Sequence, residues 1–269
     1  MRKPLSIPIY NRRYIYWTAK PDIGIVFAVS IAWKTGPRTE MREVNMDGSH
    51  GFSSLKSKQR ALRDHFPEPM KLRTHRAISW IKRSEMCEGD DDAKFIFLWI
   101  AFNSAYADEI RFKDNNSTER RSFKTYFKKI VDLDIDHRIS NALWKRFSGP
   151  VRLLMESPYT FKDFWQYHNG VSGFENWRNS FVNDKKKFIT AFERNENVKV
   201  LVHVFDRLYT LRNQLVHGGS TWNSHVNRTQ VKDGAEILGF LLPIFVDLMM
   251  DNPEDDWGMP FFPVVEDNA

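Results

Sequence analysis

The sequence has a single cysteine, Cys87, among its 269 residues. No internal disulfide can therefore form, which favours a reducing compartment and predicts a cytoplasmic protein. CxxC pairs and HxxxH spacings are also absent, so the sequence predicts no metal site and no cofactor. The segment GGSTWN lacks the Lys-Ser/Thr pair of a phosphate-binding P-loop, which leaves nucleotide hydrolysis without support.

Long hydrophobic runs are missing as well. The apolar run IGIVFAVSIAW covers only residues 23–33, whereas a helix needs about 20 residues to cross a bilayer. We therefore expect no membrane segment, and we interpret the run as a buried strand or as part of an upstream extension. Residues 1–45 show no helical period and are treated as an amino-terminal extension of uncertain status, followed by a helical domain at 46–251 and an acidic tail at 252–269.

Charge is unevenly distributed along the chain, although the net charge is only +6. Residues 1–86 contain 17 Lys and Arg against 7 Asp and Glu, whereas residues 247–269 contain 7 acidic residues and no basic ones. A basic segment fits contact with the phosphates of RNA, through counterion release and long-range attraction. Such segments are also often simply solvated, so charge alone leaves both interpretations open.

Helical periodicity dominates from about residue 52 onward and predicts an all-α bundle. The strongest helix of the first half is AKFIFLWIAFNSAYADEI, which follows the acidic run GDDD. Asp90–Asp92 lie where carboxylates cap a helix and interact favourably with its dipole. The broad apolar face of this helix predicts a place at the centre of the core, with these residues on it: Phe95, Leu98, Phe102 and Ala105.

A second informative helix is expected over residues 198–217, and it ends in RLYTLRNQLVHGG. One face is apolar and packs into the core, and the opposite face is a polar stripe with His203 nearby: Asp206, Thr210, Asn213 and His217. The stripe is too sparse for an ordinary surface face, which indicates that it meets a partner. Arg212 lies about 140° around the helix from His217, but a long side chain and a position at the helix end allow the two to converge.

Arg212, Asn213 and His217 are the candidate catalytic residues. Histidine exchanges protons near neutral pH, arginine offers a charged fork that matches a phosphate, and a carboxamide can orient either group. Together they suit metal-free cleavage of a phosphodiester by the neighbouring 2′-hydroxyl. Spacing alone is a weak signal, because about 0.6 Arg-x4-His matches are expected by chance. Arg60 and His65 form another match, which we interpret as exposed helix residues.

The segment LYTLRNQLVHGG, placed before a final long helix, resembles the signature of the HEPN superfamily: an arginine, a polar residue, three further residues and a histidine. The resemblance extends over roughly residues 90–250 through two further segments, FLWIAFNSAY and DGAEILGFLLPIFVDLMM. Within the superfamily, the sequence is similar to the Apea-like HEPN proteins of bacteria. Arg212, Asn213 and His217 match the arginine, the polar position and the histidine. Some toxins of the superfamily carry a tyrosine two positions after the histidine, which an antitoxin modifies; Gly219 stands there in this sequence, so that control is not supported.

The resemblance implies a HEPN-like helical bundle that forms a homodimer and brings two motifs into one cleft. Many members are metal-independent endoribonucleases of toxin–antitoxin and antiviral-defence systems, which implies RNA as substrate and an antitoxin or defence protein as partner. Other members have lost catalysis and bind RNA, a nucleotide or a partner protein. A third interpretation is a helical interaction protein in which Arg212 only ties helices together.

Overall fold

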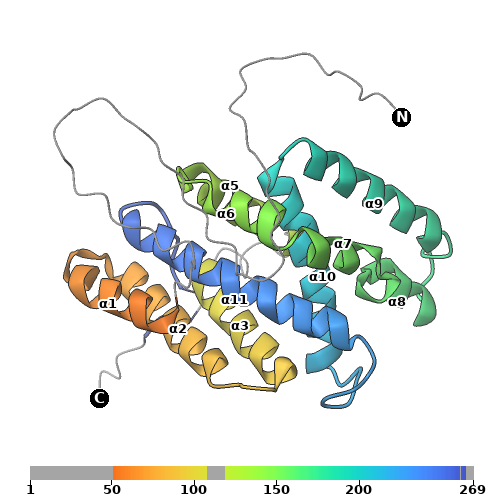
Figure 1. Ribbon diagram of the computed structural model, residues 1–269, viewed down its shortest axis with the longest axis horizontal. Helices are drawn as coiled ribbons and strands as arrows, with labels where there is room; N and C mark the ends of the chain where they lie inside the picture. The colour runs from red at the N-terminus through yellow and green to blue at the C-terminus, as the bar shows by residue number, and fades with distance from the viewer. Residues whose placement is uncertain (1–50, 108–118, 261, 265–269) are drawn as a thin grey trace, which may run out of the picture. The chain divides into compact units, whose positions relative to one another are not determined.

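The computed structural model describes residues 51–107, 119–260 and 262–264, and only the backbone of 119–122, so the predicted extension at 1–45 lies outside the described residues. Within these ranges the regular structure is helical and contains no β-strand, which confirms the all-α fold class (Figure 1). None of the described helices combines the length and the apolar character needed to cross a bilayer.

The elements are α1 (Phe52–Leu62), η1 (Arg63–His65), α2 (Glu68–Glu85), α3 (Asp91–Tyr106), α5 (Glu119–Leu133), α6 (Arg138–Asn141), the π-helical turn η2 (Ala142–Arg146), α7 (Ser148–Glu156), η3 (Pro158–Thr160), α8 (Lys162–His168), α9 (Trp177–Glu193), α10 (Asn197–Val216) and α11 (Arg228–Asp251).

Helix α3 lies in the centre of the core, as its apolar face predicts. The helix begins where the acidic run predicts, because Asp90 is its N-cap and accepts a 2.9 Å hydrogen bond from the backbone N–H of Ala93. An aspartate at this position typically contributes about 1 kcal/mol to stability. The predicted core positions are at most 2% exposed: Phe95, Leu98, Phe102 and Ala105.

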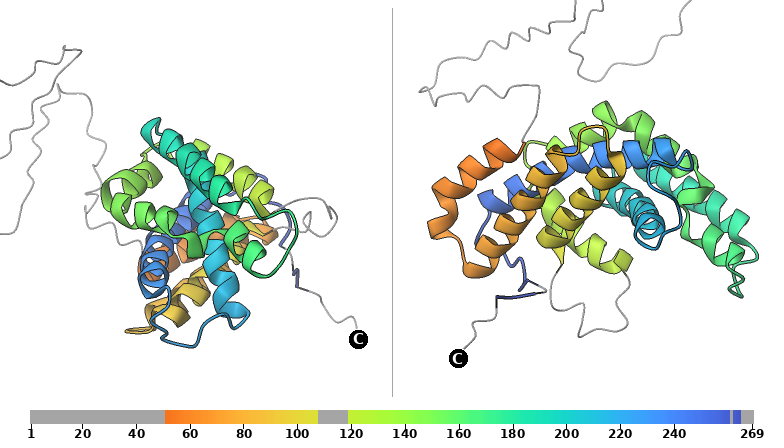
Figure 2. Two further views of the ribbon diagram at one scale, coloured as in Figure 1. Left: turned by 90° about the vertical axis from the view of Figure 1, so that its right-hand side faces the viewer. Right: turned by 90° about the horizontal axis from the view of Figure 1, so that it is seen from below.

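An aromatic cluster joins α3, α5, α10 and α11. The ring of Phe205 in α10 lies 4.6 Å from Phe102 of α3 and 4.7 Å from Phe127 of α5, and the ring of Phe245 in α11 lies 6.2 Å away. Helix α11 crosses the bundle and contacts α2 and α3 as well as α5, α7 and α10 (Figures 1 and 2). Because aromatic rings bury a large apolar area, this cluster fixes the position of α10, the helix that carries the candidate site.

The carboxy-terminal tail folds back on the bundle, where a buried arginine holds it. The guanidinium of Arg73 in α2 donates hydrogen bonds to the carbonyl oxygens of Ala105 and Ala107, at 3.1 and 2.7 Å. It also donates to the carbonyls of Gly258 and Met259 in the tail, at 3.3 and 3.0 Å. A positive charge is favourable at the carboxy-terminal end of a helix, where carbonyls lack partners within the helix. One side chain therefore caps α3 and ties the tail to α2.

Asp247 of α11 connects three helices through two cations. Its carboxylate accepts hydrogen bonds from Nζ of Lys58 in α1 at 2.6 Å and from Nη1 of Arg138 in α6 at 2.7 Å. Burial by itself would raise the pKa of Asp247, but the hydrogen bonds and positive charges of Lys58 and Arg138 outweigh burial and lower the pKa. The ionised carboxylate is therefore the form that stabilises the fold.

We expect this carboxylate to make the protein lose stability as the pH falls below about 4. The pKa of Asp247 is lower in the folded than in the unfolded chain, so the unfolded chain binds the proton first. The stabilisation is complete above the unfolded pKa of about 3.9 and is lost as the pH falls through the folded pKa. Urea denaturation at a series of pH values measures the free energy of unfolding. As the pH is lowered, this free energy should decrease less steeply in Asp247→Asn than in the wild type. Equal slopes for both proteins would contradict this role.

Candidate active site

Helix α10 carries the predicted site residues and ends in a glycine cap. The helix ends at Val216, one residue before the predicted boundary, and His217 is its C-cap. Gly218 has a φ of +69°, in the left-handed region that favours glycine. Its N–H bonds the carbonyl three residues earlier at 3.4 Å, and the N–H of Gly219 bonds the carbonyl of Gln214 at 2.7 Å. This pair of bonds is the Schellman pattern, so the two glycines fix the helix end and do not leave it frayed.

Arg212, Asn213 and His217 lie in the last turns of α10, next to this cap. Arg212 and Asn213 are partly exposed, and Nη1 of the guanidinium donates a 3.0 Å hydrogen bond to Oδ1 of the carboxamide. His217 is exposed, and its backbone N–H bonds the carbonyl of Asn213 at 3.0 Å. Within the described part of the chain the imidazole makes no hydrogen bond or ion pair, with Arg212 or with any other side chain. Within one copy of the chain, the arginine is therefore hydrogen-bonded to the asparagine, and the histidine is exposed to solvent.

The loop at residues 218–227 is fastened to the amino-terminal end of α3. The two oxygens of Asp92 accept hydrogen bonds from the guanidinium of Arg228 at 2.7 and 3.3 Å, and Oδ2 also accepts one from the backbone N–H of Asn223 at 2.9 Å. Asp90 accepts a further bond, at 3.1 Å, from the indole N–H of the tryptophan in the loop. The acidic run, predicted only to cap α3, therefore also positions the loop beside the candidate histidine.

Asp92→Ala is expected to loosen this loop and to lower the free energy of unfolding by about 1–3 kcal/mol, because the variant cannot form the charge-assisted hydrogen bonds to Arg228. Hydrogen exchange of the backbone amides at residues 218–227, followed by mass spectrometry, should become faster. Asp91→Ala is the matched control, since Asp91 is the neighbouring carboxylate of the same turn and has no described contact with the loop. Equal exchange rates in the two variants would show that Asp92 does not hold the loop.

Gln214 ties the last turns of α10 to two other segments. Its Nε2 donates a 2.6 Å hydrogen bond to the carbonyl of Tyr159 in η3, and its Oε1 accepts a 2.7 Å bond from Nδ2 of Asn227, the N-cap of α11. Both ends of the amide are therefore engaged. The backbone around Arg212 is held by neighbouring segments as well as by its own helix.

Part of the expected polar stripe is buried, which corrects the prediction that the whole stripe meets a partner: Thr210 is 8% exposed, whereas Asp206 is partly exposed. His203, which lies beside the stripe, and Arg207, one turn further along α10, are also buried, at 6% and 2% exposed. Both contact Asp184 of α9: Nδ1 of the imidazole lies 3.3 Å from one carboxylate oxygen, and Nη2 of the guanidinium lies 2.8 Å from the other. A buried charge needs such a partner, and α9 supplies it by packing along α10. At the carboxy-terminal end of the stripe Asn213 is partly exposed and His217 is exposed, so this end is the most accessible.

Arg207 is enclosed by aromatic rings as well as paired with a carboxylate. Its guanidinium lies 4.5 Å from the ring centroid of Phe161 and 5.4 Å from that of Phe181, within the range of cation–π attraction. Burial raises the pKa of the neighbouring Asp163, and the negative charge of Asp184 adds to this effect. This cluster joins α8, α9 and α10, and the sequence pattern did not predict it.

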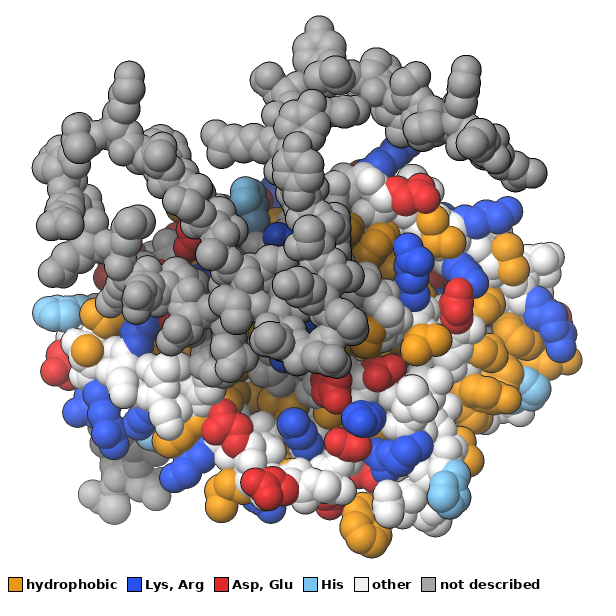
Figure 3. All heavy atoms as spheres, in the orientation of Figure 1, with side chains coloured by type: hydrophobic (Ala, Val, Ile, Leu, Met, Phe, Trp, Pro, Cys, Tyr) orange, Lys and Arg blue, Asp and Glu red, His pale blue; other side chains and the backbone are white. Residues whose placement is uncertain are grey.

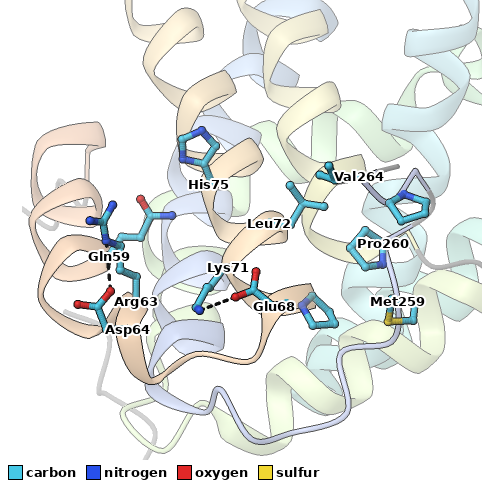
Figure 4. Close-up of a pocket in the computed structure, with 12 residues that line it drawn as sticks. Gln59, Arg63, Asp64, Glu68, Lys71, Leu72, His75, Met259, Pro260 and Val264 are labelled. Carbon is cyan, nitrogen blue, oxygen red and sulfur yellow. Dashed lines mark hydrogen bonds and ion pairs between the residues drawn. The ribbon is translucent and has the colours of Figure 1, made fainter. Parts of the chain in front are cut away.

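A separate cavity of about 620 Å³ opens between α1, α2 and the tail (Figure 4). Four of the charged side chains that line the cavity form two ion pairs: Nζ of Lys71 lies 2.5 Å from Glu68, and Nε of Arg63 lies 3.7 Å from Asp64. None of the predicted site residues lines this cavity. Its remaining walls are largely apolar and include Leu72, Met259, Pro260 and Val264.

Figure 3 shows two further features on one face of the molecule. Lys and Arg side chains follow α9 in Figure 3, and hydrophobic side chains gather over α8, where Tyr167 is 39% exposed. Arg60 and His65, the other Arg-x4-His match, are both exposed, as predicted. The described residues contain no group of three or more His, Cys, Asp or Glu placed to hold a metal ion.

No protein-family model matches the sequence, and neither the curated proteins nor the solved structures compared with it show significant similarity. The resemblance to the HEPN superfamily therefore stays a prediction, carried by Arg212, Asn213 and His217 and by the two flanking segments.

Proposed function

We propose that this protein is a metal-independent endoribonuclease of the toxin or antiviral-defence type, which cleaves RNA through the neighbouring 2′-hydroxyl. Arg212, Asn213 and His217 are its functional side chains. The observation that carries the proposal is the hydrogen-bonded pair of Arg212 and Asn213 beside an exposed His217 at an accessible helix end. An antitoxin or a defence protein is the partner that such an activity requires for its control.

Each side chain has a role that its chemistry supports. His217 takes the proton of the 2′-hydroxyl or gives one to the leaving 5′-oxygen, since imidazole changes charge near neutral pH. Arg212 holds the scissile phosphate and balances the charge that develops on it. Asn213 fixes the guanidinium through Oδ1 and keeps its NH₂ group for the substrate. The 2′-oxygen bonds to phosphorus as the bond to the 5′-oxygen breaks, which leaves a 2′,3′-cyclic phosphate and a 5′-hydroxyl.

A homodimer is the proposed way to bring an arginine and a histidine onto one phosphate. Within one copy the side chains of Arg212 and His217 have no described contact. The end of α10 is surrounded by exposed apolar residues, which typically mark an interaction surface: Val216 at 49%, Trp222 at 74% and Val226 at 60%. A second copy that packs against this rim would place two α10 ends opposite each other and form a composite site.

Cleavage of RNA by the wild type, Arg212→Ala and His217→Ala, all with EDTA present, tests the proposal. We expect both variants to lose at least about 10²-fold in rate, because proton transfer and stabilisation of charge in the transition state each contribute this much or more. His225→Ala is the matched control, since it removes another exposed histidine from the adjacent loop and should retain wild-type activity. If wild type and variants leave RNA equally intact, the enzyme proposal fails.

One observation favours the alternative, a HEPN-type module that binds RNA, a nucleotide or a partner protein without cleaving it. No described side chain orients the imidazole of His217, whereas a catalytic histidine usually has a partner that fixes one ring nitrogen. The alternative requires that binding survives His217→Ala and that no cleavage occurs under any metal condition. The same set of variants therefore separates the two functions.

A further inference from the structure

A basic pocket lies on the amino-terminal half of α10, away from the Arg212–His217 end. The cavity has a volume of about 520 Å³ and lies between α5, α9 and α10. Its distance from the proposed active site is considerable, because an α-helix rises about 22 Å over the fifteen residues from Val202 to His217. Cationic side chains from all three helices line it: Lys124, Lys186, Lys187, Arg194 and Lys199.

The positive charge of this pocket is only partly neutralised. Among the described lining residues Glu196 is the one carboxylate, and it pairs with Lys199 at 2.8 Å. No described carboxylate lies within ion-pair distance of the other four cations. Lys185 belongs to the same run of lysines but lies on the α7 side of α9, where it pairs with Glu156 at 3.2 Å. The excess charge is therefore specific to one face of α9.

The wall that α10 supplies combines apolar side chains with a fixed histidine. Val198 and Val202 provide the apolar part. His203, whose side chain is 7% exposed, also lines the cavity and is held by Asp184, 3.3 Å from its Nδ1. That contact engages Nδ1, so Nε2 is the ring nitrogen without a described partner. Ligand sites commonly combine apolar walls with a few fixed polar groups in cavities of roughly 300–1,000 Å³.

We propose that this pocket binds the phosphate groups of a nucleotide, either free or within a single-stranded chain. Several cations that converge on one cavity favour a ligand with several negative charges close together, as in a polyphosphate or a phosphodiester chain. The apolar wall offers a surface for the base or the sugar. Binding here needs no cleavage, so the inference goes beyond the proposed ribonuclease activity and does not depend on it.

Binding of two probes to the full-length protein at low salt tests this site. The probes are ATP and a fluorescein-labelled oligodeoxyuridylate, which has no 2′-hydroxyl and so remains intact even if the protein is a ribonuclease. We expect Lys186→Glu and Lys187→Glu, made singly, to weaken binding at least about tenfold. Lys124→Glu should do the same from α5. For the oligonucleotide, the slope of log Kd against log salt should fall by about 1 for each phosphate that a variant no longer binds.

Lys185→Glu is the matched control, because it makes the same charge reversal in the same helix but outside the pocket. It should bind both probes like the wild type. Binding of ATP alone identifies a free nucleotide as the ligand, and binding of the oligonucleotide identifies a strand. The proposal is overturned if neither probe binds the wild type with a Kd below about 1 mM. It is also overturned if Lys185→Glu weakens binding as much as Lys186→Glu does.

Discussion

Asp184→Ala should lower the free energy of unfolding by about 3–5 kcal/mol, because it removes the carboxylate from a buried guanidinium. The side chain of Arg207 is 3% exposed and lies 2.8 Å from Asp184. The same substitution removes the partner of His203, which lies 3.3 Å from the other carboxylate oxygen. Urea denaturation followed by circular dichroism measures the decrease in stability. The result would show that α9 is held against α10 by this buried network.

Two further variants separate the effect of pairing from the effect of packing. The double variant Asp184→Ala/Arg207→Met removes both charges and should recover part of the stability, because no buried charge then lacks its partner. Glu193→Ala removes an acidic side chain from an exposed position of α9, and its effect should stay within about 0.5 kcal/mol. If Asp184→Ala is no more destabilising than Glu193→Ala, the network does not hold the two helices together.

Arg73→Met is expected to destabilise the fold by about 3 kcal/mol or more and to release the tail. Four backbone carbonyls lose this donor, and a buried acceptor without a partner, as at Ala105, costs about 1–3 kcal/mol. The carboxy-terminal end of α3 also loses the positive charge that caps it. Urea denaturation measures the stability, and limited proteolysis at residues 258–264 measures release of the tail.

Arg76→Met is the matched control for Arg73→Met. It removes the same charge from the same helix, but Arg76 is partly exposed and its described hydrogen bond goes to the carbonyl of Phe262 at 2.6 Å. We expect its effect to stay below about 1 kcal/mol. Arg73→Lys should fall between the two, because an ammonium keeps the charge but cannot reproduce the planar fork of donors. Equal losses of stability in Arg73→Met and Arg76→Met would show that the buried guanidinium of Arg73 contributes no more to the fold than a partly exposed arginine of the same helix.

The parts of the fold that depend on neighbouring residues could be predicted from the sequence. Asp90 caps α3 by bonding Ala93, three positions further on, and the acidic run before an apolar period is enough to predict this. The Gly-Gly pair likewise marks the end of α10, where Gly219 bonds the carbonyl of Gln214 five positions back. Local chemistry thus located both the core helix and the end of the helix that carries the candidate site.

Contacts between distant segments could not be predicted. Asp184 and Arg207 are 23 positions apart, and nothing in the run VNDKKK marks this aspartate as buried. Arg73 reaches a tail carbonyl 186 positions away, and Asp92 reaches Arg228 across 136 positions. One local signal was present: His203 lies one turn before Arg207 on the same helix, a spacing that can indicate a shared buried partner. For the candidate site, the residue types follow from the sequence, whereas the fold determines which part of the stripe is accessible.

Identification of the product ends tests most directly the proposed cleavage of RNA through the 2′-hydroxyl at the end of α10. The substrate is an oligonucleotide with one ribonucleotide linkage among 2′-O-methyl residues, incubated with EDTA. We expect the wild type to cut only that linkage and to leave a 2′,3′-cyclic phosphate and a 5′-hydroxyl, while His217→Ala leaves the substrate whole. No cutting by the wild type, a 3′-hydroxyl product, or equal cutting by His217→Ala would contradict the claim.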